Sequence, residues 1–170
     1  MRIASVTPLR LRGLATLPRL SCAETGLLLG VAALLALALF GPGLPASAHQ
    51  HDFADQRTLW GIPCALDVLS NLTFALAGAW GWWELRRVPP GALDAASRAL
   101  AALFFGGLLC TAAGSALYHW QPQDTSLRWD RLGMVLPFAG LLGLAAASRV
   151  SARAGAVSYT HLTLPTTPYV

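Results

Sequence analysis

Charged residues are scarce in this sequence. Only 12% of its 170 residues are charged, whereas a soluble domain carries about 25%. Hydrophobic residues make up 55%, and the mean hydropathy is +0.52. A chain this apolar cannot hide its surface inside one soluble core of this size, and the bilayer is the solvent that tolerates it. The composition therefore predicts an integral membrane protein whose length fits one domain.

Cysteine is also scarce, and its spacing excludes several kinds of site. Cys22, Cys64 and Cys110 form no C-x-x-C pair and no metal-binding spacing, so we expect no disulfide framework. Cys110 lies inside an apolar run and is most simply a small buried residue. Cys22 is not a lipoprotein signal, because the hydrophobic stretch follows it instead of preceding it.

The charge that is present is basic, with 12 basic against 8 acidic residues and a formal net charge of +4. A basic balance can indicate nucleic-acid binding. Here the arginines stand at the edges of apolar runs, which is typical of a membrane protein. We therefore expect a membrane and no nucleic acid among the partners, while the composition says nothing about protein partners.

Four apolar runs are separated by polar segments, at residues 26–40, 62–83, 99–118 and 132–150. A membrane span needs roughly 20 apolar residues at about 1.5 Å each. The last three runs meet that length, whereas the first is short. Three tryptophans, at positions 80, 82 and 83, end the second run, as expected where a helix reaches the headgroups. The pattern predicts an all-α fold, a polytopic transmembrane helix bundle.

The first run has two interpretations. Ala46-Ser47-Ala48 has the A-x-A form of a signal-peptidase site, which favours a cleaved signal peptide. The basic segment before the run is unusually long, which favours an uncleaved anchor. We divide the chain into residues 1–48 with this segment, a transmembrane region at 49–156, and a tail at 157–170.

The tail has a foreign character. Residues 157–166 resemble the translation of a common transposon sequencing adapter, and the alternative is a short natural cytoplasmic tail. Segments of this kind are excluded from fold reasoning. We therefore give His161 no functional weight. We expect the protein to continue past Ala156, so that this chain is its N-terminal part.

The arginines predict the orientation in the membrane. Four precede the first run, and three lie between residue 84 and Arg98. The positive-inside rule then places the N-terminus, the 84–97 loop and Arg153 in the cytoplasm. The 45–60 and 119–131 loops fall together on the opposite face, which brings many of the polar residues of the chain together.

Three polar side chains are expected at one membrane surface. Ser115 and His119 are four residues apart, so they share one helix face, and Asp130 follows eleven residues later across a turn. A histidine and a carboxylate at a helix mouth can bind a metal or move protons. The alternatives are an interfacial histidine, a serine packing contact and a carboxylate paired with an arginine.

Further polar residues precede or begin the second run. Asp67 and Ser70 are three apart and share a face, and a carboxylate inside a membrane helix is functional unless it is shallow enough to reach water. Asp52 and Asp55 form an acidic patch whose oxygens would suit a hard cation such as calcium. A solvated loop is the simpler reading of that patch.

These segments together resemble the alkaline ceramidase family, within the group of seven-helix membrane hydrolases that includes the adiponectin receptors. The motifs are Ser70-Asn71, Gly114-Ser115-Ala116-Leu117-Tyr118-His119, Asp130-Arg131-Leu132-Gly133-Met134, and His51-Asp52-Phe53-Ala54-Asp55-Gln56, which resembles the bacterial form of the acidic segment. The resemblance covers about residues 50–150. It implies that the chain is the N-terminal part of a seven-helix ceramidase-like fold in a bacterial inner membrane, in which the arginines place the 119–131 loop on the non-cytoplasmic side.

The resemblance also implies a chemistry. In the family three histidines hold zinc, one in the Ser-x-x-x-His helix and two in an H-x-x-x-H pair near the C-terminus. His119 matches the first, and none of the other histidines matches the pair. Asp52 and Asp55 match the calcium segment, although Cys64 stands where a Glu or Asn ligand is expected.

We therefore expect the intact protein to be a zinc-dependent hydrolase of non-peptide amide bonds in ceramide-like sphingolipids. In this scheme His119 is a zinc ligand, and Asp130 and Ser115 are catalytic. The substrate would be a lipid amide that enters from the bilayer. Without the histidine pair, the chain as given is expected to be inactive. The alternatives are a receptor-like or transport-like multi-pass membrane protein without catalysis, and a purely structural anchor.

Overall fold

The computed structural model describes residues 20–43, 47–151 and 153–155, and this part of the chain forms helices and no β-strand. The elements are α1 (Cys22–Phe40), α2 (Ala65–Ser70), α3 (Leu72–Arg87), α4 (Ala95–Trp120) and α5 (Asp124–Arg149). Three of them, α1, α4 and α5, are long and apolar enough to cross a membrane. The all-helical prediction is confirmed. The tail at 157–170 with His161, and Ala46 of the A-x-A sequence, lie outside the described residues.

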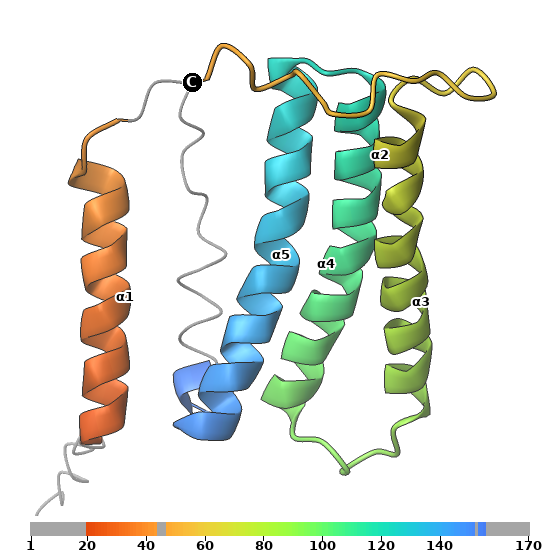
Figure 1. The fold of residues 1–170 in the computed structure, drawn as a ribbon. Helices are drawn as coiled ribbons and strands as arrows, with labels where there is room; N and C mark the ends of the chain where they lie inside the picture. Colours follow the sequence, from red (N-terminus) through yellow and green to blue (C-terminus); the bar gives the residue numbers. More distant parts are fainter. Residues whose placement is uncertain (1–19, 44–46, 152, 156–170) are drawn as a thin grey trace, which may run out of the picture.

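Helix α1 is longer than the first apolar run and stands apart from the other helices (Figure 1). It starts at a capping box, in which the Ser21 hydroxyl accepts from the Glu24 N–H at 3.2 Å and the Glu24 carboxylate accepts from the Ser21 N–H at 2.9 Å. Glu24 also binds the end of the bundle, because its carboxylate accepts from Ser151 at 2.7 Å and pairs with Arg153 at 3.2 Å. These polar contacts connect α1 to the bundle.

The second apolar run differs from the prediction of one continuous span. It forms two helices, α2 and α3, stacked end to end in Figure 1 and divided at Asn71. The Asp67 carbonyl accepts from the Asn71 carboxamide at 2.9 Å and from the Ser70 hydroxyl at 2.8 Å. The Asn71 backbone N–H turns instead to the Val68 carbonyl at 3.3 Å, three residues back. Side-chain competition for one carbonyl therefore interrupts the regular helix.

The core is the seam between the antiparallel helices α4 and α5, which lie beside α3 in one row (Figure 1). Glycines allow the two backbones to approach closely, since a Cβ on Gly133 would lie 2.8 Å from the Cys110 carbonyl oxygen. The Thr111 hydroxyl bridges the seam by bonding to the carbonyls of Gly107 and Gly133, each at 3.0 Å. Close backbone approach at small residues is the usual way in which membrane helices associate.

Gly140 offers a test of this packing. A Cβ at this position would lie 2.6 Å from the Phe104 nitrogen and 2.8 Å from its Cα, so only a backbone shift would make room. We expect Gly140→Ala to lower the free energy of unfolding by about 1–3 kcal/mol, the usual cost of overpacking. Thermal unfolding in detergent micelles measures it. Gly30→Ala in α1 is the control, because a Cβ there has no neighbour within 4 Å. Equal stability of the two variants would contradict the close seam.

Candidate functional site at the end of the α4–α5 hairpin

A tight turn brings the end of α4 beside the start of α5. Helix α4 ends at Trp120 and α5 begins at Asp124, so a short segment reverses the chain. The Ser126 hydroxyl holds this turn, accepting from the Gln123 N–H at 3.2 Å and also contacting the carbonyls of Gln121 and Gln123. The hairpin is therefore closed by hydrogen bonds at the end that carries the predicted site.

The structure places Ser115 and Asp130 at the same level of the seam. A Cβ on Gly114, the neighbour of Ser115, would lie 2.5 Å from the Trp129 carbonyl oxygen and 3.2 Å from the Asp130 nitrogen. Asp130 is only 9% exposed, and Ser115 is half-buried. Neither side chain has a hydrogen bond within the described residues, and Asp130 has no ion pair there. The arginine-paired interpretation of Asp130 therefore has no support in the described part of the chain.

His119 lies one helical turn beyond Ser115 and has an unsatisfied buried atom. Its Nδ1 is buried and has no hydrogen-bond partner among the described residues. The Phe53 ring covers the imidazole, with centroids 4.4 Å apart, and the Tyr118 ring lies 5.5 Å away. A buried polar atom without a partner costs about 1–3 kcal/mol, so it needs an explanation such as a bound ligand.

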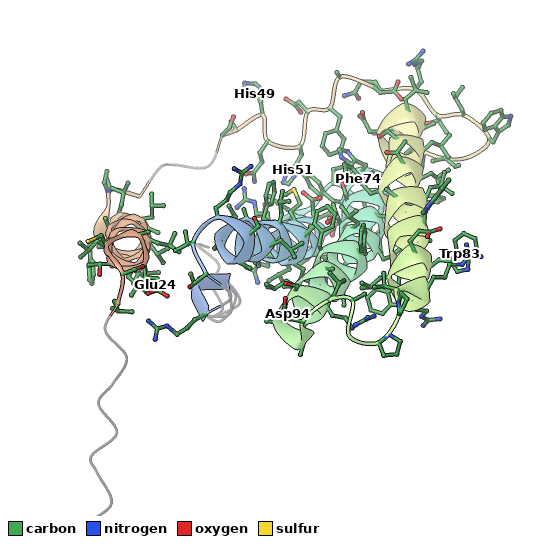
Figure 2. All side chains as sticks on the ribbon, turned by 90° about the horizontal axis from the view of Figure 1, so that it is seen from below. Glu24, His49, His51, Phe74, Trp83 and Asp94 are labelled. Atoms are coloured by element: carbon green, nitrogen blue, oxygen red, sulfur yellow. The ribbon has the colours of Figure 1, made fainter. Side chains whose placement is uncertain are left out.

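The segment of residues 47–57, here called the strap, crosses this end of the hairpin. The Tyr118 hydroxyl donates to the Gln50 carbonyl at 2.7 Å and lies 3.0 Å from the His51 Nδ1. The Asp124 carboxylate accepts from the Gln50 carboxamide at 2.9 Å and lies 3.2 Å from the His51 Nε2. Figure 2 shows His49 and His51 on the segment that leads from α1 toward α2. Sequence reasoning placed the strap at the same end of the bundle as the α4–α5 turn, where the structure has it, but did not find these contacts.

The two carboxylates predicted as calcium ligands have separate partners. Asp52 is exposed and pairs with His49 at 2.7 Å. Asp55 is buried, pairs with the Arg57 Nε at 2.7 Å and accepts from the Leu66 N–H in the first turn of α2 at 2.8 Å. The Arg57 guanidinium, followed by the Leu66 N–H, holds the pKa of Asp55 below its usual range. Asp55 thus helps to start α2, and the calcium site stays a prediction.

The fit of zinc to these residues is incomplete. His119 supplies one imidazole nitrogen without a hydrogen-bond partner among the described residues, so no such bond competes with a metal for it. No group of three His, Cys, Asp or Glu side chains able to hold a metal forms within residues 20–43, 47–151 and 153–155. A catalytic zinc normally has three protein ligands. The described residues therefore offer one candidate zinc ligand, His119, and do not complete a zinc site.

Comparison of the chain with protein-family models, with curated proteins and with solved structures gives no match. The case for a function therefore rests on the residues themselves. It consists of a buried carboxylate, a half-buried hydroxyl and an imidazole with an unsatisfied nitrogen, all near one end of two membrane-length helices.

Proposed function

We propose that the intact protein is a membrane-embedded, zinc-dependent amidohydrolase that cleaves the amide bond of ceramide-like lipids. The observation that carries the proposal is the set of Ser115, His119 and Asp130, none of which has a side-chain hydrogen bond within the described residues although His119 Nδ1 and Asp130 are buried. Unpaired polar groups inside membrane helices are costly, and they commonly mark a functional site. The resemblance to alkaline ceramidases supplies the reaction class.

Each side chain has a proposed role. His119 would hold zinc, which when bound lowers the pKa of water toward neutrality and polarises a carbonyl. Asp130 would accept the proton of the attacking water and later return it to the leaving amine. Ser115 would donate a hydrogen bond to the oxygen that develops negative charge as the amide carbon becomes tetrahedral. Two further ligands would have to come from an H-x-x-x-H pair, which the 170 residues of this sequence do not contain.

A groove on the same seam supports a lipid substrate. It has a volume of about 350 Å³ and an apolar lining that includes Gly114, Leu117, Trp129 and Leu132. Gly114 and Trp129 are the chain neighbours of Ser115 and Asp130, although none of the three proposed site residues lines the groove itself. An acyl chain suits such a lining, because it buries apolar surface without needing hydrogen-bond partners.

Metal content and turnover test the proposal. We expect the full-length protein to contain zinc and to release a fatty acid from a ceramide, and we expect the chain 1–170 to do neither, for want of ligands. Metal analysis of purified protein and chromatography of the lipid products provide the measurements. Zinc without turnover of any lipid amide would favour the receptor-like or transport-like alternative. Stoichiometric zinc or turnover in 1–170 would contradict the proposed ligand set.

The orientation in the bilayer can be tested separately. The arginines predict that Ala92, in the 84–97 loop, is cytoplasmic and that Thr125 is outside. Arg98 binds the Leu85, Val88 and Pro89 carbonyls, each at 3.1 Å, and Arg87 lies 3.3 Å over the Trp83 ring, as suits a membrane interface. After replacement of the native cysteines, an impermeant thiol reagent on intact cells should label Thr125→Cys and leave Ala92→Cys unlabelled. The reverse pattern would refute the orientation.

A further inference from the structure

Phe53 lies between two anchors of the strap. On one side of it, the Gln50 carbonyl accepts from the Tyr118 hydroxyl at 2.7 Å, which ties the strap to α4. On the other side, the buried Asp55 carboxylate accepts from the Leu66 N–H at 2.8 Å, which ties it to α2. The Gln56 carboxamide donates to the Phe53 carbonyl at 2.7 Å and fixes the backbone between the anchors. The position of Phe53 is therefore determined by contacts with two helices.

The Phe53 ring packs on two rings of α4 at once. Its centroid lies 4.4 Å from that of His119 at an interplanar angle of 55°, and 5.2 Å from that of Tyr118 at 88°. Ring pairs at these distances attract each other beyond the effect of area burial alone. The His119 Nδ1, which is buried and without a partner in the described residues, belongs to the ring that Phe53 packs against, while the His119 side chain as a whole is half-buried.

We propose that Phe53 is a positioning residue and a lid for His119. The anchored strap holds the Phe53 ring against the imidazole and so fixes the orientation of the imidazole. The Phe53 ring also keeps water of the aqueous phase away from the buried His119 Nδ1. A substrate would then approach His119 from the bilayer rather than from the aqueous phase. The consequence for substrate entry rests on the proposed function, whereas the shielding of His119 does not depend on it.

Chemical modification of the present chain tests the shielding. Diethyl pyrocarbonate carbethoxylates accessible neutral imidazoles, and mass spectrometry of peptides reports each histidine separately. His49 is the internal reference, because its side chain is 83% exposed. We expect Phe53→Ala to raise the rate at His119 about tenfold relative to His49, since the loss of two ring contacts shifts an opening equilibrium by about that factor. Tyr118→Phe, which removes the anchor hydroxyl, should give a smaller rise.

Two variants separate the lid from general loosening. Phe53→Trp keeps an aromatic ring on His119 and should restore a rate close to that of the unmodified chain. Phe138→Ala removes a phenylalanine that is 61% exposed on α5 and should leave the carbethoxylation rate at His119 unchanged. Equal His119 rates in the wild type and Phe53→Ala, or an equal rise with Phe138→Ala, would overturn the proposal. If Phe53→Ala does not fold, Tyr118→Phe decides, and an unchanged His119 rate in that variant refutes the lid. None of these outcomes depends on turnover.

Discussion

Asp130→Asn in the full-length protein is expected to lower lipid-amide turnover by roughly 10²–10⁴-fold, the usual contribution of general acid–base catalysis. The substitution keeps the shape of the side chain and removes its charge and its capacity to accept a proton. Zinc should stay bound, because Asp130 is not a proposed ligand. Turnover of a ceramide and metal analysis of the same preparation measure the two effects.

Stability distinguishes this expectation from a structural role. Asp130 is 9% exposed and has no hydrogen bond or ion pair among the described residues, so the change to Asn breaks no contact there. The thermal midpoint should therefore stay the same or rise while turnover falls. Asp94→Asn is the matched control, because Asp94 caps the opposite end of α4 by accepting from the Ser97 N–H at 2.9 Å, and asparagine caps about as well. Unchanged turnover in Asp130→Asn would exclude a role in proton transfer.

His119→Ala is expected to remove zinc and turnover together. His119 supplies one of three proposed protein ligands, and its loss leaves a set too small for a catalytic zinc site. Zinc content should fall from about one per chain to near zero, with turnover below detection. Metal analysis and product chromatography follow both losses.

The chain offers a matched histidine as the control. His49 is exposed and pairs with Asp52, so His49→Ala should keep both zinc and turnover. The unfolding midpoint of His119→Ala in the present chain 1–170 should fall modestly, because the imidazole contacts with the Phe53 and Tyr118 rings are lost, although Nδ1 has no hydrogen bond to lose within the described residues. Full zinc content in the full-length His119→Ala variant would show that the imidazole is not a ligand, whatever its effect on activity.

Hydropathy and spacing predicted the α4–α5 hairpin, but the expected loop at 119–131 is wrong: only residues 121–123 lie between the helices, and Asp130 lies inside α5. Both helices are apolar over more than a span, and a polar turn with Pro122 separates them, so their antiparallel arrangement follows from sequence. The common level of Ser115 and Asp130 follows from that arrangement. The distance between the two helix backbones could not be predicted, because their close approach requires glycines of both helices to lie opposite the partner backbone.

Two features, the helix break at Asn71 and the contacts of the strap, depend on individual hydrogen bonds and could not be predicted from the hydropathy pattern. The break at Asn71 arises because two side chains take the Asp67 carbonyl, and an averaged hydropathy does not detect that competition. The sequence of the strap predicts only a polar loop. Its position is set by a hydrogen bond from Tyr118, a residue distant in sequence. Such long-range contacts are specified only when the helices are already assembled.

The seam between α4 and α5 also has a consequence for how the protein is made. Because a short turn joins these helices and their contacts are local in sequence, the hairpin can form early and enter the bilayer as one unit. In the orientation that the arginines predict, Asp130 would cross the hydrocarbon region against another helix rather than exposed to lipid. Variation along the seam, as at Gly140, would therefore change how many molecules reach the membrane, whereas under the proposed function variation at Asp130 would change the activity of each molecule.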